Sequence, residues 1–322
     1  MTPQQIEYVL LVAQLRSFSK AAQKLYITQP SLSKYIINIE RQLGTEIFDR
    51  STTPISLTAA GEAYVATARQ IKAAQDDLAN RIADMQNLRA GTLKIGTSTF
   101  RTSYMLARSI SQFCREHAGV EVSIADNNSE NLKEMLRAGQ IDLLISTGSF
   151  DPKYFDVEPL ATEQLYAAVP AAAPVNGKLA DWQLSWEDIS SRSERFLRAK
   201  PVDLSRLRDV PFILPQQEEF NEEVMQRSFI AFGGLPEPAL RVRTIDAAFS
   251  FVVSGFGMTL IPDTMIHFGN YAAHPVFYAL EPAHAQRQIC LVMRRSSYVS
   301  KAAAAYCLAL KRLVEIGTWR IL

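Results

Sequence analysis

The chain has little of what zinc proteins, disulfide-stapled proteins and hydrolases depend on. Its three cysteines, Cys114, Cys290 and Cys307, are far apart and form no CxxC pair. They suggest neither a zinc site nor a disulfide framework, so we expect ordinary packed or surface thiols. The four histidines show no metal-ligand spacing, and no GxSxG sequence occurs. No activated nucleophile can be assembled from these residues, so we expect no enzyme, no metal site and no cofactor.

Long apolar runs and an excess of charge are also absent. No apolar run approaches the roughly 20 residues that cross a bilayer. The first residues, MTPQQIEYVLLVAQ, lack the basic leader and continuous apolar stretch of a signal peptide. We therefore expect a soluble, cytoplasmic protein with no membrane contact. Because the net charge is only +1, evidence for a nucleic-acid partner has to come from local pattern.

Length and composition predict more than one folded unit. With 322 residues, the chain is too long for one ordinary core. With 48% hydrophobic and 21% charged residues, it is too apolar to be disordered. We expect two or three packed units.

The first 60 residues follow a helix-turn-helix pattern. Ile6, Val9, Leu10 and Ala13 form a helical apolar stripe, and a short second helix, SKAAQKL, is expected with Ser19 as its cap. After a turn at residues 26–27, a third helix is expected with Thr28 as N-cap, Pro30 in its first turn and Gly44 at its end. This order of helices is typical of a helix-turn-helix.

The third helix and the segment after it carry the candidate DNA contacts. The apolar stripe of Leu32, Ile36, Ile39 and Leu43 leaves polar residues near the helix start facing away from the core, namely Gln29, Ser31, Ser33, Lys34 and Asn38. Such side chains can read base edges and phosphates in a major groove, although a solvated helix face would look the same. Residues 47–50 and 55–57 predict a hairpin wing. Arg50 at its base can meet a phosphate or pair with Asp49 or Glu46.

These residues resemble a known family. The segment SFSKAAQKLYITQPSLSKYIINIERQLGTEIFDRSTTPISLTAAGE is similar to the DNA-binding segment of LysR-type transcriptional regulators. The combination of SxAA, TQPSLS, IExxLG, FxR and LTxAG is highly specific. Carried over position by position, the resemblance implies DNA contacts at Gln29, Ser31, Ser33, Lys34 and Arg50.

A long helix is expected to follow the DNA-binding unit. No proline or glycine occurs between Gly61 and Gly91. Two sets of residues repeat every seven positions along this stretch and form one stripe, which is apolar except for Gln75: Tyr64, Ile71, Leu78 and Met85, and between them Ala68, Gln75 and Ile82. A helix of about 30 residues is about 45 Å long and cannot bury this stripe in a small domain. We expect a coiled-coil contact between two subunits, with packing on the chain's own domains as the alternative. The resemblance implies the same dimerisation helix.

From Gly91 onward, strands and helices alternate, which predicts a parallel sheet covered by helices. The family resemblance implies a two-lobed, periplasmic-binding-protein-like sensor domain. We therefore predict an α/β protein overall, with a winged helix-turn-helix at 1–58, a linker helix at 59–90 and an effector-binding domain at 91–322. Lobe I is expected at 91–160 and 266–322, and lobe II at 161–265.

Polar residues follow successive predicted strands, where ligands gather in open α/β sheets. The candidate effector contacts are Ser98, Thr99, Phe100, Arg101, Thr102, Asn128, Ser129, Thr147, Gln216 and Gln217. Hydroxyl-rich helix starts suit an anion, although each serine or threonine alone is an ordinary cap. Arg101 can neutralise an anion or face solvent, and Phe100 can stack on a ligand ring or fill the cleft.

The segment at about 171–210 departs from the family pattern. It is roughly twenty residues longer than the usual connection and contains Trp182 and Trp186. We expect a lid, an extra helix at lobe II, an oligomer contact or a surface insertion without a role in recognition.

These patterns, together with the family resemblance, predict a sequence-specific, DNA-binding transcriptional regulator that senses a small, anionic metabolite between the lobes. The expected partners are double-stranded DNA, the small-molecule effector, other copies of the chain in a homodimer or homotetramer, and RNA polymerase. The alternatives are a scaffold with a non-sensing cleft that only mediates assembly, and a thiol redox sensor.

Overall fold

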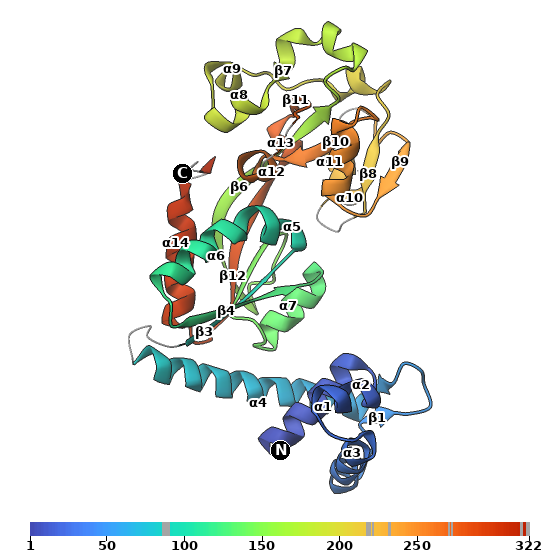
Figure 1. Ribbon diagram of the computed structural model, residues 1–322, viewed down its shortest axis with the longest axis vertical. Coiled ribbons are helices and arrows are strands. Elements are labelled where there is room, and N and C mark those ends of the chain that lie inside the picture. Colours follow the sequence, from blue (N-terminus) through green and yellow to red (C-terminus); the bar gives the residue numbers. More distant parts are fainter. Residues whose placement is uncertain are drawn as a thin grey trace.

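The computed structural model describes residues 1–85, 91–216, 220, 222–230, 233–269, 271, 273–315 and 318–319. Figure 1 shows three parts in chain order: a small helical domain at the N-terminus, a long helix, and an elongated α/β domain of two lobes. This architecture is the predicted one. No helix in these ranges combines the length and apolar character needed to span a bilayer.

The N-terminal domain is a helix-turn-helix with a hairpin wing. Its elements are α1 (Pro3–Leu15), α2 (Phe18–Lys24), α3 (Gln29–Leu43), β1 (Phe48–Asp49) and β2 (Ser56–Leu57). Thr28 caps α3, and Gly44, at φ 72°, ends it in the left-handed conformation that glycine adopts without strain. Ser17, rather than the predicted Ser19, caps α2. The antiparallel pairing of β1 with β2 confirms the wing.

Helix α4 (Ala59–Asp84) divides its apolar stripe between two environments. Tyr64 and Ala68 are buried in the core of the N-terminal domain. Farther along, Leu78, Ile82 and Met85 are 58%, 53% and 81% exposed. The stripe is therefore not one continuous seam: its first half packs on the chain's own domain, which was the alternative to a subunit contact. Residues 86–90 of the predicted linker lie outside the described residues.

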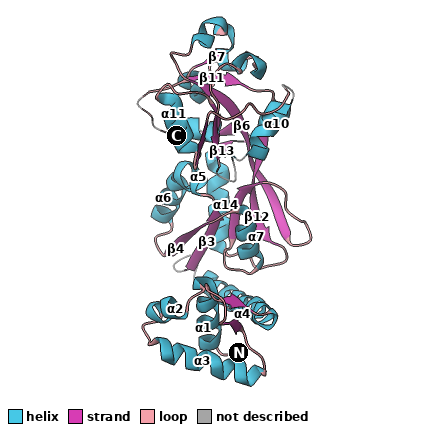
Figure 2. Ribbon diagram, turned by 90° about the vertical axis from the view of Figure 1, so that its right-hand side faces the viewer, coloured by secondary structure: helices cyan, strands magenta, loops and turns pink. Residues whose placement is uncertain are grey.

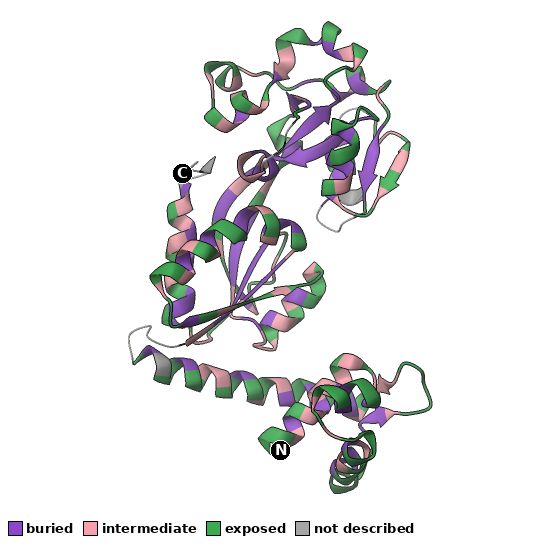
Figure 3. Cartoon of the chain, viewed as in Figure 1, coloured by how far each residue is buried: buried purple, intermediate pink, exposed green. Residues whose placement is uncertain are grey.

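Another side of α4 attaches to lobe I. Asp76 forms an ion pair with Lys94, with an N–O distance of 2.8 Å. Asp84 accepts hydrogen bonds from the Tyr298 hydroxyl at 2.6 Å and from the Lys301 backbone N–H at 2.8 Å. Figure 3 shows this second half of α4 as mainly exposed, except where it faces the lobe. The contacts fix the direction in which α4 leaves the α/β domain.

Lobe I is a sheet covered by helices. Strand β3 (Gly91–Thr97) lies between β4 (Val120–Asp126) and β5 (Leu143–Thr147) and is parallel to both. Strand β12 (Gln286–Arg294) pairs antiparallel with β5. The helices are α5 (Thr99–Arg101), η1 (Thr102–Leu106), α6 (Ala107–Glu116), α7 (Ser129–Arg137) and α14 (Lys301–Leu313). β13 (Val314–Glu315) and β14 (Thr318–Trp319) form a short hairpin at the end of the described chain.

Strand β6 (Phe155–Val169) runs from one lobe into the other (Figure 2). Its first part pairs with β12, and its last part pairs with β10 (Thr259–Pro262) and β11 (Val276–Ala279). A separate parallel pair is formed by β8 (Ile213–Pro215) and β9 (Leu240–Val242). The other helices here are α10 (Glu222–Phe229), α11 (Ile245–Val253), α12 (Asp263–Phe268) and α13 (Pro282–Ala285).

One predicted boundary is wrong. We placed everything after residue 265 in lobe I, but β11 pairs with the end of β6 and with β7 (Gln183–Leu184), both in lobe II. The chain therefore returns to lobe I through β12. The error arose because the strand at 276–279 is too short to be assigned to either lobe by its pattern alone.

The segment at 171–210 folds onto lobe II. It comprises η2 (Pro174–Lys178), η3 (Ala180–Trp182), β7, α8 (Trp186–Ser191), α9 (Glu194–Leu197) and η4 (Leu204–Leu207). Leu184, Ile189 and Leu204 are buried in the lobe II core. Among the expectations for this segment, the extra helix at lobe II agrees with the structure, which has several short helices there. We call residues 171–210 the insertion.

A buried carboxylate joins the two lobes. Glu163, on β6, accepts hydrogen bonds from Thr264 at 2.5 Å, from Arg101 at 3.3 Å and from Arg287 at 2.6 Å. The side chains of Glu163 and Arg101 are both fully buried. Burial raises the pKa of Glu163, but Arg101, Arg287 and Thr264 together outweigh it, so the pKa falls from 4.5 to about 2. The carboxylate is therefore ionised at neutral pH.

We predict that Glu163→Gln lowers the free energy of unfolding by about 3–5 kcal/mol, because it leaves two guanidinium groups without their buried anion. Denaturant unfolding followed by circular dichroism measures this. Glu158→Gln is the matched control: this residue lies on the same strand and pairs with Lys311 at the surface. It should cost less than about 1 kcal/mol. Equal losses in the two variants would contradict the role assigned to Glu163.

The depressed pKa also predicts a pH dependence. Because the folded pKa of Glu163 lies below its ordinary value of 4.5, its contribution is complete above about pH 4.5 and is lost as the pH falls towards 2. The wild-type protein should therefore lose more stability than Glu163→Gln between these two pH values. Parallel stability curves would contradict the assignment.

Candidate functional site

The first turns of α3 present a polar surface. Gln29, Ser31 and Lys34 are exposed and Ser33 is half-buried, while Leu32 and Ile36 are fully buried in the domain core. The Ser31 hydroxyl lies 2.8 Å from the hydroxyl of the cap residue Thr28. A helix held by its apolar side and polar at its free start has the arrangement that enters a major groove.

Arg50, at the base of the wing, is tied to α3 through Glu40. The guanidinium and the Glu40 carboxylate are 2.7 Å apart, and the arginine side chain is 34% exposed. Glu40 also accepts hydrogen bonds from the backbone N–H groups of Ile47 and Phe48, at 2.9 and 3.2 Å. The intramolecular partner is therefore Glu40, and neither Asp49 nor Glu46. The ion pair holds Arg50 beside α3. Because the arginine side chain is partly exposed, it can still meet a phosphate.

Three strand ends in lobe I share one sheet edge. Because β3 is parallel to β4 and β5, the residues that follow these strands lie at the same edge. Ser98 caps α5, and Asn128 caps α7 by accepting from the Asn131 N–H at 2.8 Å. Thr147 ends β5. We call this the interlobe edge.

Some predicted contacts at this edge are already engaged. The Thr99 hydroxyl donates to Asp126 at 2.6 Å, and the Thr102 hydroxyl donates to the Ser98 carbonyl at 3.1 Å. Ser129 is the first residue of α7 and is half-buried. Asn128 is exposed.

Arg101 takes neither of its two predicted roles, whereas Phe100 takes the second of its own. Arg101 neither meets an anionic ligand nor faces solvent, because its guanidinium is buried against Glu163. Phe100 is 1% exposed and its ring lies 5.1 Å from that of Phe220 in lobe II, so it fills the space between the lobes. In lobe II, Gln216 follows β8 and is exposed, whereas Gln217 lies outside the described residues.

A hydroxyl chain that the sequence does not reveal crosses between the lobes at this edge. Tyr104, on η1, donates a hydrogen bond to Asp246 at the start of α11, and its hydroxyl also meets that of Tyr271. Burial and the Asp246 carboxylate raise the pKa of Tyr104, so the hydroxyl stays protonated and can donate. The partners are separated from Tyr104 by 142 and 167 positions, so no local pattern indicates this contact.

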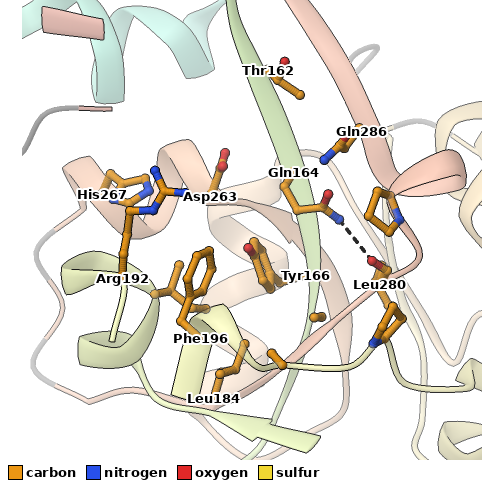
Figure 4. Close-up of a pocket in the computed structure, with 15 residues that line it drawn as sticks. Thr162, Gln164, Tyr166, Leu184, Arg192, Phe196, Asp263, His267, Leu280 and Gln286 are labelled. Carbon is orange, nitrogen blue, oxygen red and sulfur yellow. Dashed lines mark hydrogen bonds between the residues drawn. The ribbon is translucent and has the colours of Figure 1, made fainter. Parts of the chain in front are cut away.

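Figure 4 shows a cavity of about 490 Å³ that the predicted effector contacts do not line. Its walls come from β6, from the insertion, from α12 and from residues 279–286. The part of the chain that the structure describes contains no cluster of acidic, cysteine or histidine residues suited to a metal ion.

Two of the three thiols are poorly placed for redox chemistry, while that of Cys114 is half-buried. Cys290 and Cys307 are buried, and burial raises the pKa of both, that of Cys307 to about 11. A raised pKa keeps the thiol protonated and slows its reaction with peroxides.

Comparison with known proteins identifies both parts of the chain. Residues 3–62 match the model of the bacterial regulatory helix-turn-helix protein, lysR family, and residues 86–314 match that of the LysR substrate binding domain. An uncharacterized HTH-type transcriptional regulator, YcgK of Bacillus subtilis, is 28% identical over 94% of this chain and 91% of its own length. The RuBisCO operon transcriptional regulator of Acidithiobacillus ferrooxidans is 28% identical over 82% of this chain and 79% of its own.

Solved structures show the same fold at lower identity. A full-length OxyR from Pseudomonas aeruginosa, 22% identical, aligns over 98% of this chain and 96% of its own with a TM-score of 0.69. CbnR, a LysR family transcriptional regulator, aligns over 97% and 99% with a TM-score of 0.63 at 21% identity, and full-length CbnR has also been solved in complex with its target DNA.

The Glu40 contacts predict the behaviour of the wing. We expect Glu40→Ala to destabilise the wing by about 1–3 kcal/mol, because the Ile47 and Phe48 N–H groups lose their acceptor. Amide hydrogen exchange at these two residues should become faster. Glu46→Ala, which truncates an exposed glutamate in the same segment, is the control and should leave exchange unchanged. Unchanged exchange in Glu40→Ala would show that the wing does not depend on this carboxylate.

Proposed function

The chain belongs to the LysR family of DNA-binding transcriptional regulators, and we propose that it recognises a specific, twofold-related operator and responds to a small metabolite. The observation that carries the proposal is the exposed start of α3, with Gln29, Ser31 and Lys34, together with the exposed wing residue Arg50, which Glu40 holds near the other end of the same helix. Short polar side chains suit base edges, and the two cations suit phosphates. The family and the relatives are regulators of transcription and not enzymes.

We propose that α4 mediates an oligomer contact. Leu78, Ile82 and Met85 follow one another at helical spacing and are more than half exposed. An apolar row of this kind is stabilised when a second helix covers it. Two copies joined there would present two α3 helices and would require half-sites about one helical turn or more apart.

The effector is proposed to bind at the interlobe edge. Three helix and loop starts there, at Ser98, Asn128 and Thr147, carry polar groups, and the helix starts favour an anion. Arg101 is not among the groups that would receive it, because Glu163 neutralises this guanidinium. A ligand that changes the contact of Tyr104 with Asp246 would bind one arrangement of the lobes more tightly than the other. Regulation requires this difference in affinity.

Two other functions have less support. A cleft that only mediates assembly would leave protein stability unchanged by any metabolite. At Cys290 and Cys307, burial disfavours a thiol sensor, and Cys114 is half-buried. A contact with RNA polymerase stays a prediction.

We predict that Lys34→Ala weakens binding to all DNA sequences about equally and reduces the slope of log affinity against log salt by about one, because one phosphate contact is lost. Fluorescence anisotropy with a labelled operator at several salt concentrations measures this. Lys200→Ala removes the same charge from an exposed position in the insertion and should leave the slope unchanged. A wild-type slope in Lys34→Ala would remove α3 from the interface.

The exposed row on α4 predicts an oligomer that one substitution weakens. The wild-type protein should sediment as a dimer or larger species at micromolar concentration, and Leu78→Glu should shift it to smaller species, because a charge would be buried in the contact. Leu197→Glu, at a residue that is 68% exposed on α9, should not. A monomeric wild-type protein would contradict this assignment.

A further inference from the structure

The insertion closes one side of the cavity shown in Figure 4. Arg192 and Phe196 come from the insertion, Tyr166 from the crossover strand β6, and Asp263 and His267 from α12. At about 490 Å³, the cavity falls in the range of small-molecule sites. Without the insertion it would have no wall on this side. The cavity therefore depends on the insertion, which is the segment in which this chain departs from the family pattern.

Two buried polar atoms around the cavity have no partner in the described part of the chain. They are Oδ1 of Asp263 and Nδ1 of His267. Buried acceptors and donors are nearly always satisfied in native proteins, so unsatisfied ones at a cavity indicate a missing partner. A ligand that enters this cavity can supply both.

Arg192 contributes a positive charge to the same cavity. It ends α8 with φ 53°, and its own N–H bonds to the carbonyls of Asp188 and Ile189 fix its backbone. Its guanidinium points towards His267 and Asp263 (Figure 4). Within the described residues it forms no ion pair, and its carbon Cζ lies 5.6 Å from the centre of the Phe196 ring. A guanidinium placed in this way is suited to a carboxylate, which it can bind through two hydrogen bonds.

Arg192 is the cationic side chain among the described residues that line the cavity. Burial and the nearby Glu163 raise the pKa of Asp263 well above its usual range. Burial and Arg192 lower the pKa of His267 to about 4, so the imidazole is neutral. Glu163 itself is neutralised by Arg101 and Arg287 on the other side of β6. A ligand ammonium group beside Asp263 would restore the ionised carboxylate, because an opposite charge lowers its pKa.

The rest of the wall combines apolar side chains with three polar ones, those of Thr162, Gln164 and Gln286. Leu184, Ile189, Phe196 and Leu280 face the cavity, together with the aromatic ring of Tyr166. A molecule that fills the space therefore needs an apolar body beside its charged groups.

We propose that this cavity is a second ligand site, distinct from the interlobe edge, that binds an α-amino acid with an apolar or aromatic side chain. The ligand carboxylate pairs with Arg192, its ammonium group pairs with Asp263, and its side chain lies against Phe196 and Leu184. His267 supplies a further hydrogen bond to either charged group.

Calorimetric titration of the full chain with four related probes tests the ligand chemistry. L-Phenylalanine carries both charged groups, 3-phenylpropanoate lacks the ammonium, phenethylamine lacks the carboxylate, and phenyllactate replaces the ammonium with a hydroxyl. L-Phenylalanine should bind at least about tenfold more tightly than 3-phenylpropanoate or phenethylamine, with phenyllactate between them. No binding of L-phenylalanine at about 10 mM, or equal binding of the truncated probes, would overturn the proposal.

Variants test the assigned residues. Arg192→Gln should weaken L-phenylalanine binding at least about tenfold, while Arg192→Lys should retain most of it. Arg198→Gln removes the same charge from the same insertion, at a side chain that is 80% exposed and pairs with Glu194, and should leave binding unchanged. Equal loss in Arg192→Gln and Arg198→Gln, or no loss in either, would overturn the assignment. Asp263→Asn should weaken L-phenylalanine but not 3-phenylpropanoate, and loss of both would remove Asp263 from ammonium binding.

The variants also separate this site from the proposed regulatory function. Melting temperatures of the variants identify any that fail to fold, and operator binding without added amino acid should be the same in Arg192→Gln as in the wild type. Failure of the wild type to bind any operator would concern the regulator proposal alone. Failure to bind L-phenylalanine would concern this cavity alone.

Discussion

The two lobes depend on one buried carboxylate. Glu163 lies where β6 passes from lobe I to lobe II, and it gathers Arg101 from α5, Arg287 from β12 and Thr264 from α12. A carboxylate without water is costly to bury unless cations and hydrogen bonds surround it, so these four residues have to stay together. The contact fixes the relative position of the elements that carry both candidate ligand sites.

Each site lies on its own side of this contact. Towards the interlobe edge, Arg101 is held by Glu163, and the hydroxyl of Tyr104 makes a further contact between the lobes with Asp246. On the other side, Asp263 feels the negative charge of Glu163 and opens to the cavity beneath the insertion. A ligand on either side would act on elements that meet at the same buried ion pairs, which is a physical route by which occupancy can alter the geometry of the lobes.

Local features could be predicted from the sequence, and long-range partners could not. The cap at Thr28, the end at Gly44 and the wing all depend on residues within a few positions, so the helix-turn-helix was predicted almost element by element. The interlobe edge followed from the rule that parallel strands end together. Arg101 pairs with a carboxylate 62 positions away. The local sequence around an arginine that follows a strand is the same whether the arginine binds a ligand or such a carboxylate, so the sequence could not distinguish these two roles. The cavity brings together β6, the insertion and α12, and no periodicity describes how they meet.

The central claim is that α3 and the wing read specific DNA. The most direct measurement is recovery of genomic fragments from the source organism by the purified full chain at about 150 mM salt, where nonspecific attraction to phosphates is weak. The account predicts discrete, twofold-related sites beside a small number of genes. Uniform recovery of all fragments, independent of sequence, would contradict it.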